Sequence, residues 1–170
     1  MAILFCTHKV LNELGLSKNK VLSLAHSESS LENWYVNLFY QDRKKCLIFT
    51  HAETLFTFVV PNLLRKDIVP IKELLKKELS RAMYHKDFKA DEIQKVLAVL
   101  ETITISQTQS RSVLGCMNDL VFQYSVHIDP AYHPAPIDLA EINHRLNEVP
   151  MKCLGWKYAL ERFREAVSKA

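Results

Sequence analysis

Three runs of β-forming residues in the first third of the chain predict consecutive strands. The runs cover residues 34–40, 46–50 and 54–60. Only short polar segments separate them, and short connections favour antiparallel neighbours, so we expect a central meander. The second and third runs are almost continuously apolar, which is typical of a sheet covered on both faces. Pro61 should end the third strand, because proline has no N–H to donate to a neighbour.

Two further strands are predicted outside this meander. Residues 2–6 form a short apolar run, and Thr7 after it is a suitable N-cap for a helix. Residues 102–106 alternate strictly between polar and apolar side chains, which is the pattern of a half-buried strand. We therefore expect an antiparallel or mixed sheet of about four to five strands.

Helical spacing of apolar residues dominates the rest of the chain. It is clearest over residues 68–83, after Asp67, and it recurs over residues 93–100, 113–124, 139–146 and 160–167. Ser110 or Ser112 and Asp138 are suitable N-caps for two of these helices. Strands followed mainly by helices predict an α+β fold in which about five helices pack on the sheet.

Length and composition agree with one globular domain over residues 1–170. The chain is 48% hydrophobic and 24% charged, which is typical of a soluble domain. It has no apolar run near the roughly 18 residues of a membrane span and no basic leader of a signal peptide, so we expect no membrane association.

The cysteines indicate a reducing compartment. Cys6, Cys46, Cys116 and Cys153 are widely separated and form no C-x-x-C pair. Beside apolar neighbours such thiols behave as small hydrophobic groups, so we expect Cys46 and Cys116 to be buried. Free thiols are typical of cytoplasmic proteins, which is where we place this chain.

Neither a cofactor nor a metal is indicated. The three glycines, at positions 15, 115 and 155, are too far apart to form a phosphate-binding loop. His127, Asp129 and His133 come nearest to a metal-binding motif, but their spacing matches no standard site. We expect that the protein holds neither.

Two polar segments beside apolar runs are the candidates for a functional site. The first contains Trp34, Asn37 and Arg43, and the second, residues 111–119, contains Asn118. Amides and a guanidinium beside an indole ring are suited to a planar or anionic ligand. We predict a ligand- or partner-binding or regulatory protein whose site is built from these four residues, with a small molecule or a protein as its partner. The competing interpretation places Trp34 in the core and the amides on backbone groups.

Nucleic-acid binding is one alternative, because Arg43, Lys44 and Lys45 are consecutive cations that suit phosphates. The net charge is only +3 and the pI about 8.6, below the pI above roughly 9 of many nucleic-acid-binding domains. The second alternative is a cofactor-independent hydrolase or transferase. It would use Asn118, Asp119 and either His8 or His51, and it requires the two polar segments to meet in one cleft.

The same segments resemble a known family. The similar motifs are Trp34-x-x-Asn37, Arg43-x-Lys45-Cys46 and Arg111-Ser112-Val113-Leu114-Gly115-x-Met117-Asn118. They resemble those of small prokaryotic proteins known only as a domain of unknown function. The resemblance extends over almost the whole chain and implies no activity, substrate or catalytic residue. Position 35 holds Tyr, where the resemblance leads us to expect His.

Overall fold

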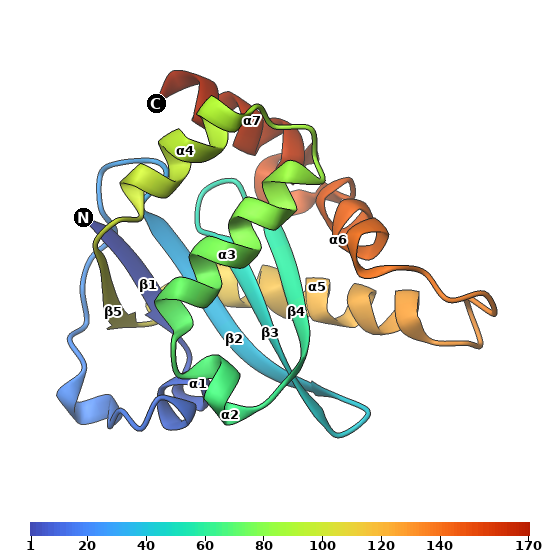
Figure 1. Ribbon diagram of the computed structural model, residues 1–170, viewed down its shortest axis with the longest axis horizontal. Helices are drawn as coiled ribbons and strands as arrows, with labels where there is room; N and C mark the ends of the chain where they lie inside the picture. The colour runs from blue at the N-terminus through green and yellow to red at the C-terminus, as the bar shows by residue number, and fades with distance from the viewer.

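A five-stranded mixed sheet forms the centre of the computed structural model, which describes residues 1–170 (Figure 1). The strands are β1 (Ala2–Cys6), β2 (Asn33–Gln41), β3 (Lys44–His51), β4 (Thr57–Leu63) and β5 (Ile103–Gln107). Their order across the sheet is β4-β3-β2-β1-β5. β1 runs parallel to both β2 and β5, whereas β2, β3 and β4 form an antiparallel meander. The predicted α+β fold with a central meander is confirmed.

Seven helices surround this sheet. They are α1 (His8–Glu13), α2 (Arg65–Ile68), α3 (Ile71–Tyr84), α4 (Ala90–Val99), α5 (Arg111–Ile128), α6 (Leu139–Asn147) and α7 (Ala159–Lys169). Between α6 and α7 lie two short strands, β6 (Pro150–Met151) and β7 (Lys157–Tyr158), joined by a 3-10 turn (Lys152–Leu154). None of the helices has both the length and the apolar character needed to cross a bilayer.

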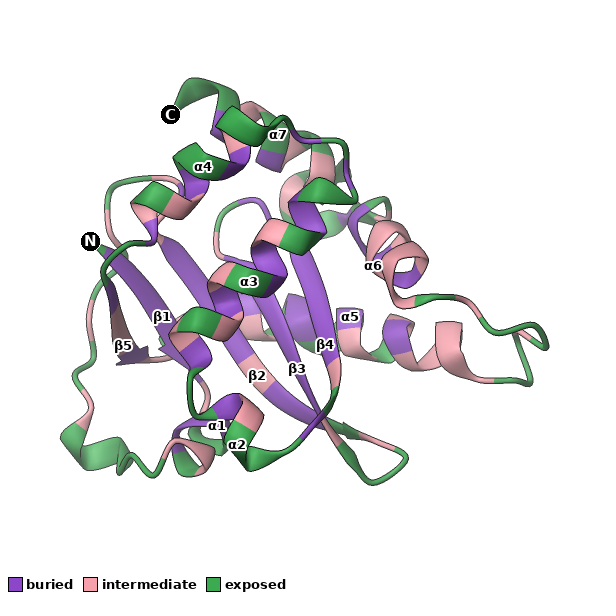
Figure 2. Cartoon of the chain, viewed as in Figure 1, coloured by how far each residue is buried: buried purple, intermediate pink, exposed green.

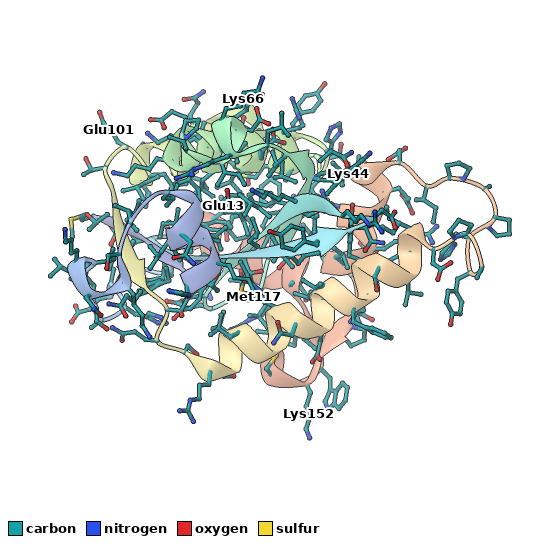
Figure 3. The ribbon with its side chains drawn as sticks, turned by 90° about the horizontal axis from the view of Figure 1, so that it is seen from below. Glu13, Lys44, Lys66, Glu101, Met117 and Lys152 are labelled. Atoms are coloured by element: carbon teal, nitrogen blue, oxygen red, sulfur yellow. The ribbon has the colours of Figure 1, made fainter.

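The sheet separates two apolar cores, because successive side chains of a strand point to opposite faces. Trp34, Val36 and Leu38 of β2 belong to the first core, which α3, α4 and α7 cover. Tyr35 and Phe39 belong to the second core, under α5 and α6. In Figure 2 the strands are accordingly buried along most of their length. Figure 3 shows the layers edge on, with α5 and its Met117 on the side of the sheet opposite α2 and α3.

Two predicted boundaries differ from the structure. Pro61 lies inside β4 instead of ending it. β4 is an edge strand, and its register against β3 shifts between Lys45 and Leu47, so the missing N–H interrupts no regular ladder. The helix expected after Asp67 is divided into α2 and α3, with Pro70 between them. Proline cannot donate the hydrogen bond that a continuous helix would need there.

Candidate ligand-binding site

Trp34 and Asn37 point to opposite faces of the sheet. Trp34 is fully buried in the first core, and its indole Nε1 donates a hydrogen bond to the carbonyl oxygen of Leu31 at 3.1 Å. Asn37 is half-buried, and its Oδ1 accepts a hydrogen bond from the Thr7 hydroxyl at 2.9 Å. Thr7 therefore uses its hydroxyl to join β1 to β2, and it makes no side-chain cap on α1.

Arg43 and Asn118 lie away from both of these residues. Arg43 is exposed in the turn between β2 and β3, where its φ is 64°. Asn118 is exposed on α5, on the helix surface that faces solvent. The structure therefore does not gather the four expected ligand-binding residues into one pocket. The sequence shows which residues are polar, but it does not show where their side chains point. Side chains alternate between the two faces of a strand and turn around the axis of a helix, so these four point in different directions.

The basic turn is only partly free to bind phosphates. The Lys45 ammonium lies 2.7 Å from Glu13 Oε1, and both side chains are largely buried by neighbouring groups. Lys44, labelled in Figure 3, is exposed, as is Arg43. These two residues, together with Arg65, line a shallow groove beside β4. Lys45, one of the three cations predicted to bind phosphates, is thus held in an ion pair that joins β3 to α1.

His51 is buried in the first core and does not meet the second polar segment. Its Nδ1 is hydrogen-bonded to the Thr54 hydroxyl at 2.9 Å. Its ring packs against those of Trp34 and Phe163, with centroids 5.1 Å and 5.7 Å away. Burial lowers the pKa of His51 to about 4. His8 is exposed, and Asp119 lies on α5 beyond the other face of the sheet. The constellation required for the enzymatic alternative is not assembled.

The buried imidazole should make the protein sensitive to acid. Between pH 6.5 and about 4 the unfolded chain protonates His51 while the folded chain does not, so stability falls as the pH falls through this range. We expect His51 to account for a loss of about 3 kcal/mol. Urea unfolding at several pH values, compared between wild type and His51→Phe, isolates this contribution. The exposed-histidine control His8→Phe should keep the wild-type profile, and a His51→Phe profile that coincides with it would contradict the assignment.

The second polar segment lines an open groove instead of a closed site. Arg111, Gly115 and Asp119 form one side of this groove, and residues 149–153 form the other. Cys116 lies in its floor, where burial and the neighbouring Cys153 raise the pKa of the Cys116 thiol to about 12. Burial also raises the pKa of Cys46. Both cysteines are free and buried, as predicted, and thiols with raised pKa values are poor nucleophiles at neutral pH.

Two asparagines of α6 form hydrogen bonds with the backbone along the free edge of β4. Asn147 accepts a hydrogen bond from the Thr57 N–H at 2.7 Å and donates one to the Thr57 carbonyl at 2.6 Å. One turn earlier, Asn143 accepts from the Val59 N–H at 2.9 Å and donates to the Val59 carbonyl at 3.5 Å. Residues four apart lie on the same face of a helix, so the two amides follow the strand as a neighbouring strand would.

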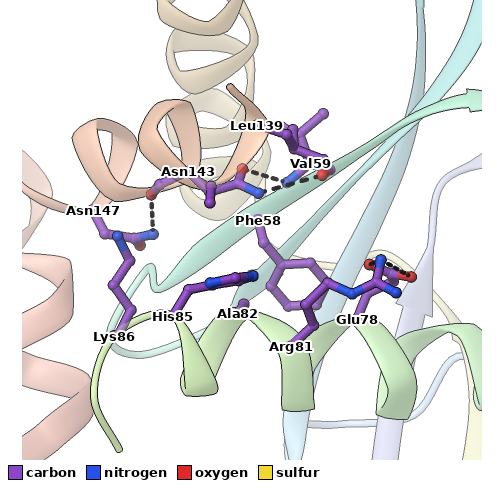
Figure 4. Close-up of a pocket in the computed structure, with 11 residues that line it drawn as sticks. Phe58, Val59, Glu78, Arg81, Ala82, His85, Lys86, Leu139, Asn143 and Asn147 are labelled. Atoms are coloured by element: carbon purple, nitrogen blue, oxygen red, sulfur yellow. Dashed lines mark hydrogen bonds and ion pairs between the residues drawn. The ribbon is translucent and has the colours of Figure 1, made fainter. Parts of the chain in front are cut away.

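These asparagines also form one wall of a cavity of about 120 Å³ between α3, β4 and α6 (Figure 4). A water molecule takes up about 30 Å³ in the liquid, so the cavity has room for roughly four water-sized groups. Phe58, Ala82 and Leu139 provide its apolar surface. An apolar cavity with a few convergent polar groups is the usual form of a small-molecule site.

Lys86 is the most unusual residue of this cavity. It is only 4% exposed, and its Nζ is buried without a hydrogen-bond partner. Figure 4 shows the amine beside Asn147, at one end of the cavity. Burial lowers the pKa of Lys86 to about 8, although the carboxylates of Glu148 and Glu141 act in the opposite direction. An unpaired buried amine carries a desolvation cost that a ligand with an acceptor atom would remove.

The opposite end of the cavity is an ion pair at the surface. Arg81 Nη1 donates to both carboxylate oxygens of Glu78, at 3.2 Å and 3.1 Å. The guanidinium is about half exposed, and its remaining N–H groups make no hydrogen bond within the protein. His85 lies between this pair and Lys86 (Figure 4). The cavity therefore has an amine at its inner end and a guanidinium at its outer end.

Sequence reasoning missed the asparagines and the burial of Lys86. Asn143 and Asn147 did leave a signal, because they share the helix face of Leu139, Ile142 and Leu146, where apolar residues are expected. Lys86 left none, since it follows α3 in a polar segment that looks like an ordinary exposed turn.

Comparison with curated proteins and with solved structures finds no match for this chain. One family model does match, over residues 3–162, and its description is a domain of unknown function, DUF6933. The match covers far more than half of the 170 residues. The resemblance noted in the sequence is thus confirmed at the level of the family, and the chain belongs to the family described as domain of unknown function DUF6933.

Proposed function

We propose that this protein binds a small anionic molecule in the cavity between α3, β4 and α6. The observation that carries the proposal is the buried amine of Lys86, a residue of the cavity lining, which has no hydrogen-bond partner in the protein. The proposal is still a ligand-binding protein, as the sequence predicts. Its site, however, is the cavity around Lys86 and not the set Trp34, Asn37, Arg43 and Asn118.

The walls of the cavity define the ligand's chemistry. Lys86 and Arg81 supply positive charge at the two ends, while Phe58 and Leu139 supply apolar contact between them. Glu78 offsets part of the charge of Arg81, so one anionic group suffices. The volume restricts the ligand to about half a dozen non-hydrogen atoms. A small carboxylate with an apolar body fits this description.

Replacing Lys86 by Met should weaken ligand binding without weakening the fold. A hydrogen bond to a charged group contributes about 1.5–3 kcal/mol, so we expect affinity to fall roughly 10–100-fold. The melting temperature without ligand should stay the same or rise, because Met is of similar length and carries no desolvation cost. Butanoate and inorganic phosphate are suitable probes, measured by thermal shift and titration calorimetry.

A matched control is available on α3, the helix that precedes Lys86. The Lys76 amine donates to the Glu101 carbonyl at 3.3 Å in an exposed position outside the cavity. Lys76→Met should therefore bind the probes as the wild type does. The proposal fails if none of the probes stabilises the wild-type protein, or if Lys86→Met and Lys76→Met respond alike.

A further inference from the structure

We propose that the ligand of this cavity is a small oxo acid, whose carbonyl carbon forms an imine with the Lys86 amine. The inference rests on the proposed function, since it assigns chemistry to the same cavity. It names a class of ligand, aldehydes or ketones that carry a carboxylate, and a covalent step in which Lys86 is the nucleophile.

The placement of the two cationic side chains supports this class. Lys86 and Arg81 lie at opposite ends of the cavity, with His85 between them (Figure 4). A ligand whose carboxylate meets the half-exposed guanidinium of Arg81 would direct its other end inward, toward the amine. Guanidinium groups bind carboxylates well because their planar N–H donors match the two oxygens. The inner group of the ligand must then suit a buried amine.

A buried amine without a partner is better suited to a carbonyl than to a second anion. No carboxylate forms an ion pair with Lys86, and burial favours the neutral form of its amine. At about pH 7.4, an amine with a pKa of about 8 is roughly one-fifth neutral, whereas an ordinary lysine is about one-thousandth neutral. Desolvated lysines of this kind act as Schiff-base nucleophiles.

The charges that face this amine come from all of the surrounding elements. On α3 and the turn after it these are Glu78, Arg81, His85 and Asp87, on α6 and directly after it they are Glu141 and Glu148, and on α7 it is Arg164. The Arg164 guanidinium also donates to the Lys86 carbonyl, which fixes the backbone of the residue. Glu148, Glu141 and Asp87 favour the ammonium and Arg164 favours the neutral amine, and burial is the largest of these influences on the pKa of Lys86.

The reaction is a condensation without any change of oxidation state. The Nζ lone pair attacks the carbonyl carbon, a C–N bond forms, and the oxygen takes a proton as the nitrogen loses one. The hydroxyl of this carbinolamine then leaves as water with one further proton, while the nitrogen lone pair forms the C=N bond, and the resulting iminium nitrogen releases its remaining proton. Amine and carbonyl thus give one imine and one water. His85, on the cavity wall, is the titratable side chain placed to carry these protons.

The test is reductive trapping on the intact wild-type protein. The protein is incubated at about pH 7.4 with 4-oxobutanoate and sodium cyanoborohydride, which reduces an imine to a stable secondary amine. Peptide mapping by mass spectrometry then measures the adduct at each lysine. We expect Lys86 to carry at least about tenfold more adduct than any other lysine, because its neutral fraction is roughly two-hundredfold higher. Lys86→Met should lose this adduct, and Lys76→Met should retain it.

Butanoate separates the failure of this inference from the failure of the proposed function, because it lacks only the carbonyl of 4-oxobutanoate. If butanoate stabilises the protein but the adduct is spread evenly over surface lysines, the imine is refuted and the binding function stands. If neither compound stabilises the protein and Lys86 is not labelled, both proposals fall. Preferential labelling of Lys86 that excess butanoate suppresses supports both. None of these readings depends on the folding of a variant.

Discussion

Replacing Phe163 by Ala should lower the free energy of unfolding by about 3–5 kcal/mol, the usual cost of deleting a fully buried phenyl ring. Phe163 is completely buried in the first core. Its ring stacks on Phe56 with centroids 4.3 Å apart and an interplanar angle of 10°. It also lies 6.0 Å from Trp34 and 5.8 Å from Phe88. One side chain of α7 thus joins aromatic groups from the sheet and from the segment after α3.

Urea unfolding measures this loss directly. Phe163→Leu is the matched control, because it keeps most of the buried volume and should cost clearly less than Phe163→Ala. The loss of stability should appear as a lower urea concentration at the unfolding midpoint, with an unchanged denaturant slope, since both variants keep the same fold. A loss below about 1 kcal/mol for Phe163→Ala would show that α7 does not complete the first core.

Replacing Asn147 by Leu should destabilise the protein by about 2–5 kcal/mol, even though Leu is apolar and of similar size. The change leaves the N–H and the carbonyl of the buried Thr57 without partners. Each buried backbone group that loses its hydrogen bond costs about 1–3 kcal/mol. The hydrogen bond from Asn147 to the Asn143 carbonyl, at 2.7 Å, is lost as well.

Asn143→Leu provides the comparison within the same helix. Asn143 is only half-buried, so water can replace its amide at Val59, and we expect a loss of about 1 kcal/mol. Urea unfolding gives both values, and hydrogen exchange should show faster exchange of the Thr57 N–H in the Asn147 variant. Equal losses of stability in the two variants would contradict the role assigned to Asn147 in pairing the buried backbone groups of Thr57.

The fold was largely predictable, because local patterns decide most of it. The β-forming runs that became β2, β3 and β4 and the alternation within β5 located the strands, and short connections implied the meander. The parallel pairing of β1 with β2 and β5 was not predictable, because it joins residues distant in the sequence. The strands β6 and β7 were missed since two residues each are too few to show a period.

The candidate site was much less predictable than the fold. A polar segment is easily recognised in a sequence, but the direction of each side chain depends on the tertiary structure. Trp34 became core and Asn37 became a link to Thr7, while Lys86 became buried only because α6 and α7 pack over it. The burial of one lysine is a property of elements that follow it by more than fifty residues.

The position of β1 in the sheet has a consequence for biosynthesis. All five residues of β1 are buried, and Ala2 is paired with Ile103 of β5. At a synthesis rate of about 5–20 residues per second, β5 emerges roughly 5–20 s after β1. Pairs so distant in sequence also form slowly, so one edge of an apolar strand remains open during this interval. The nascent chain is therefore most prone to aggregate, and most dependent on chaperones, before residue 107 has left the ribosome.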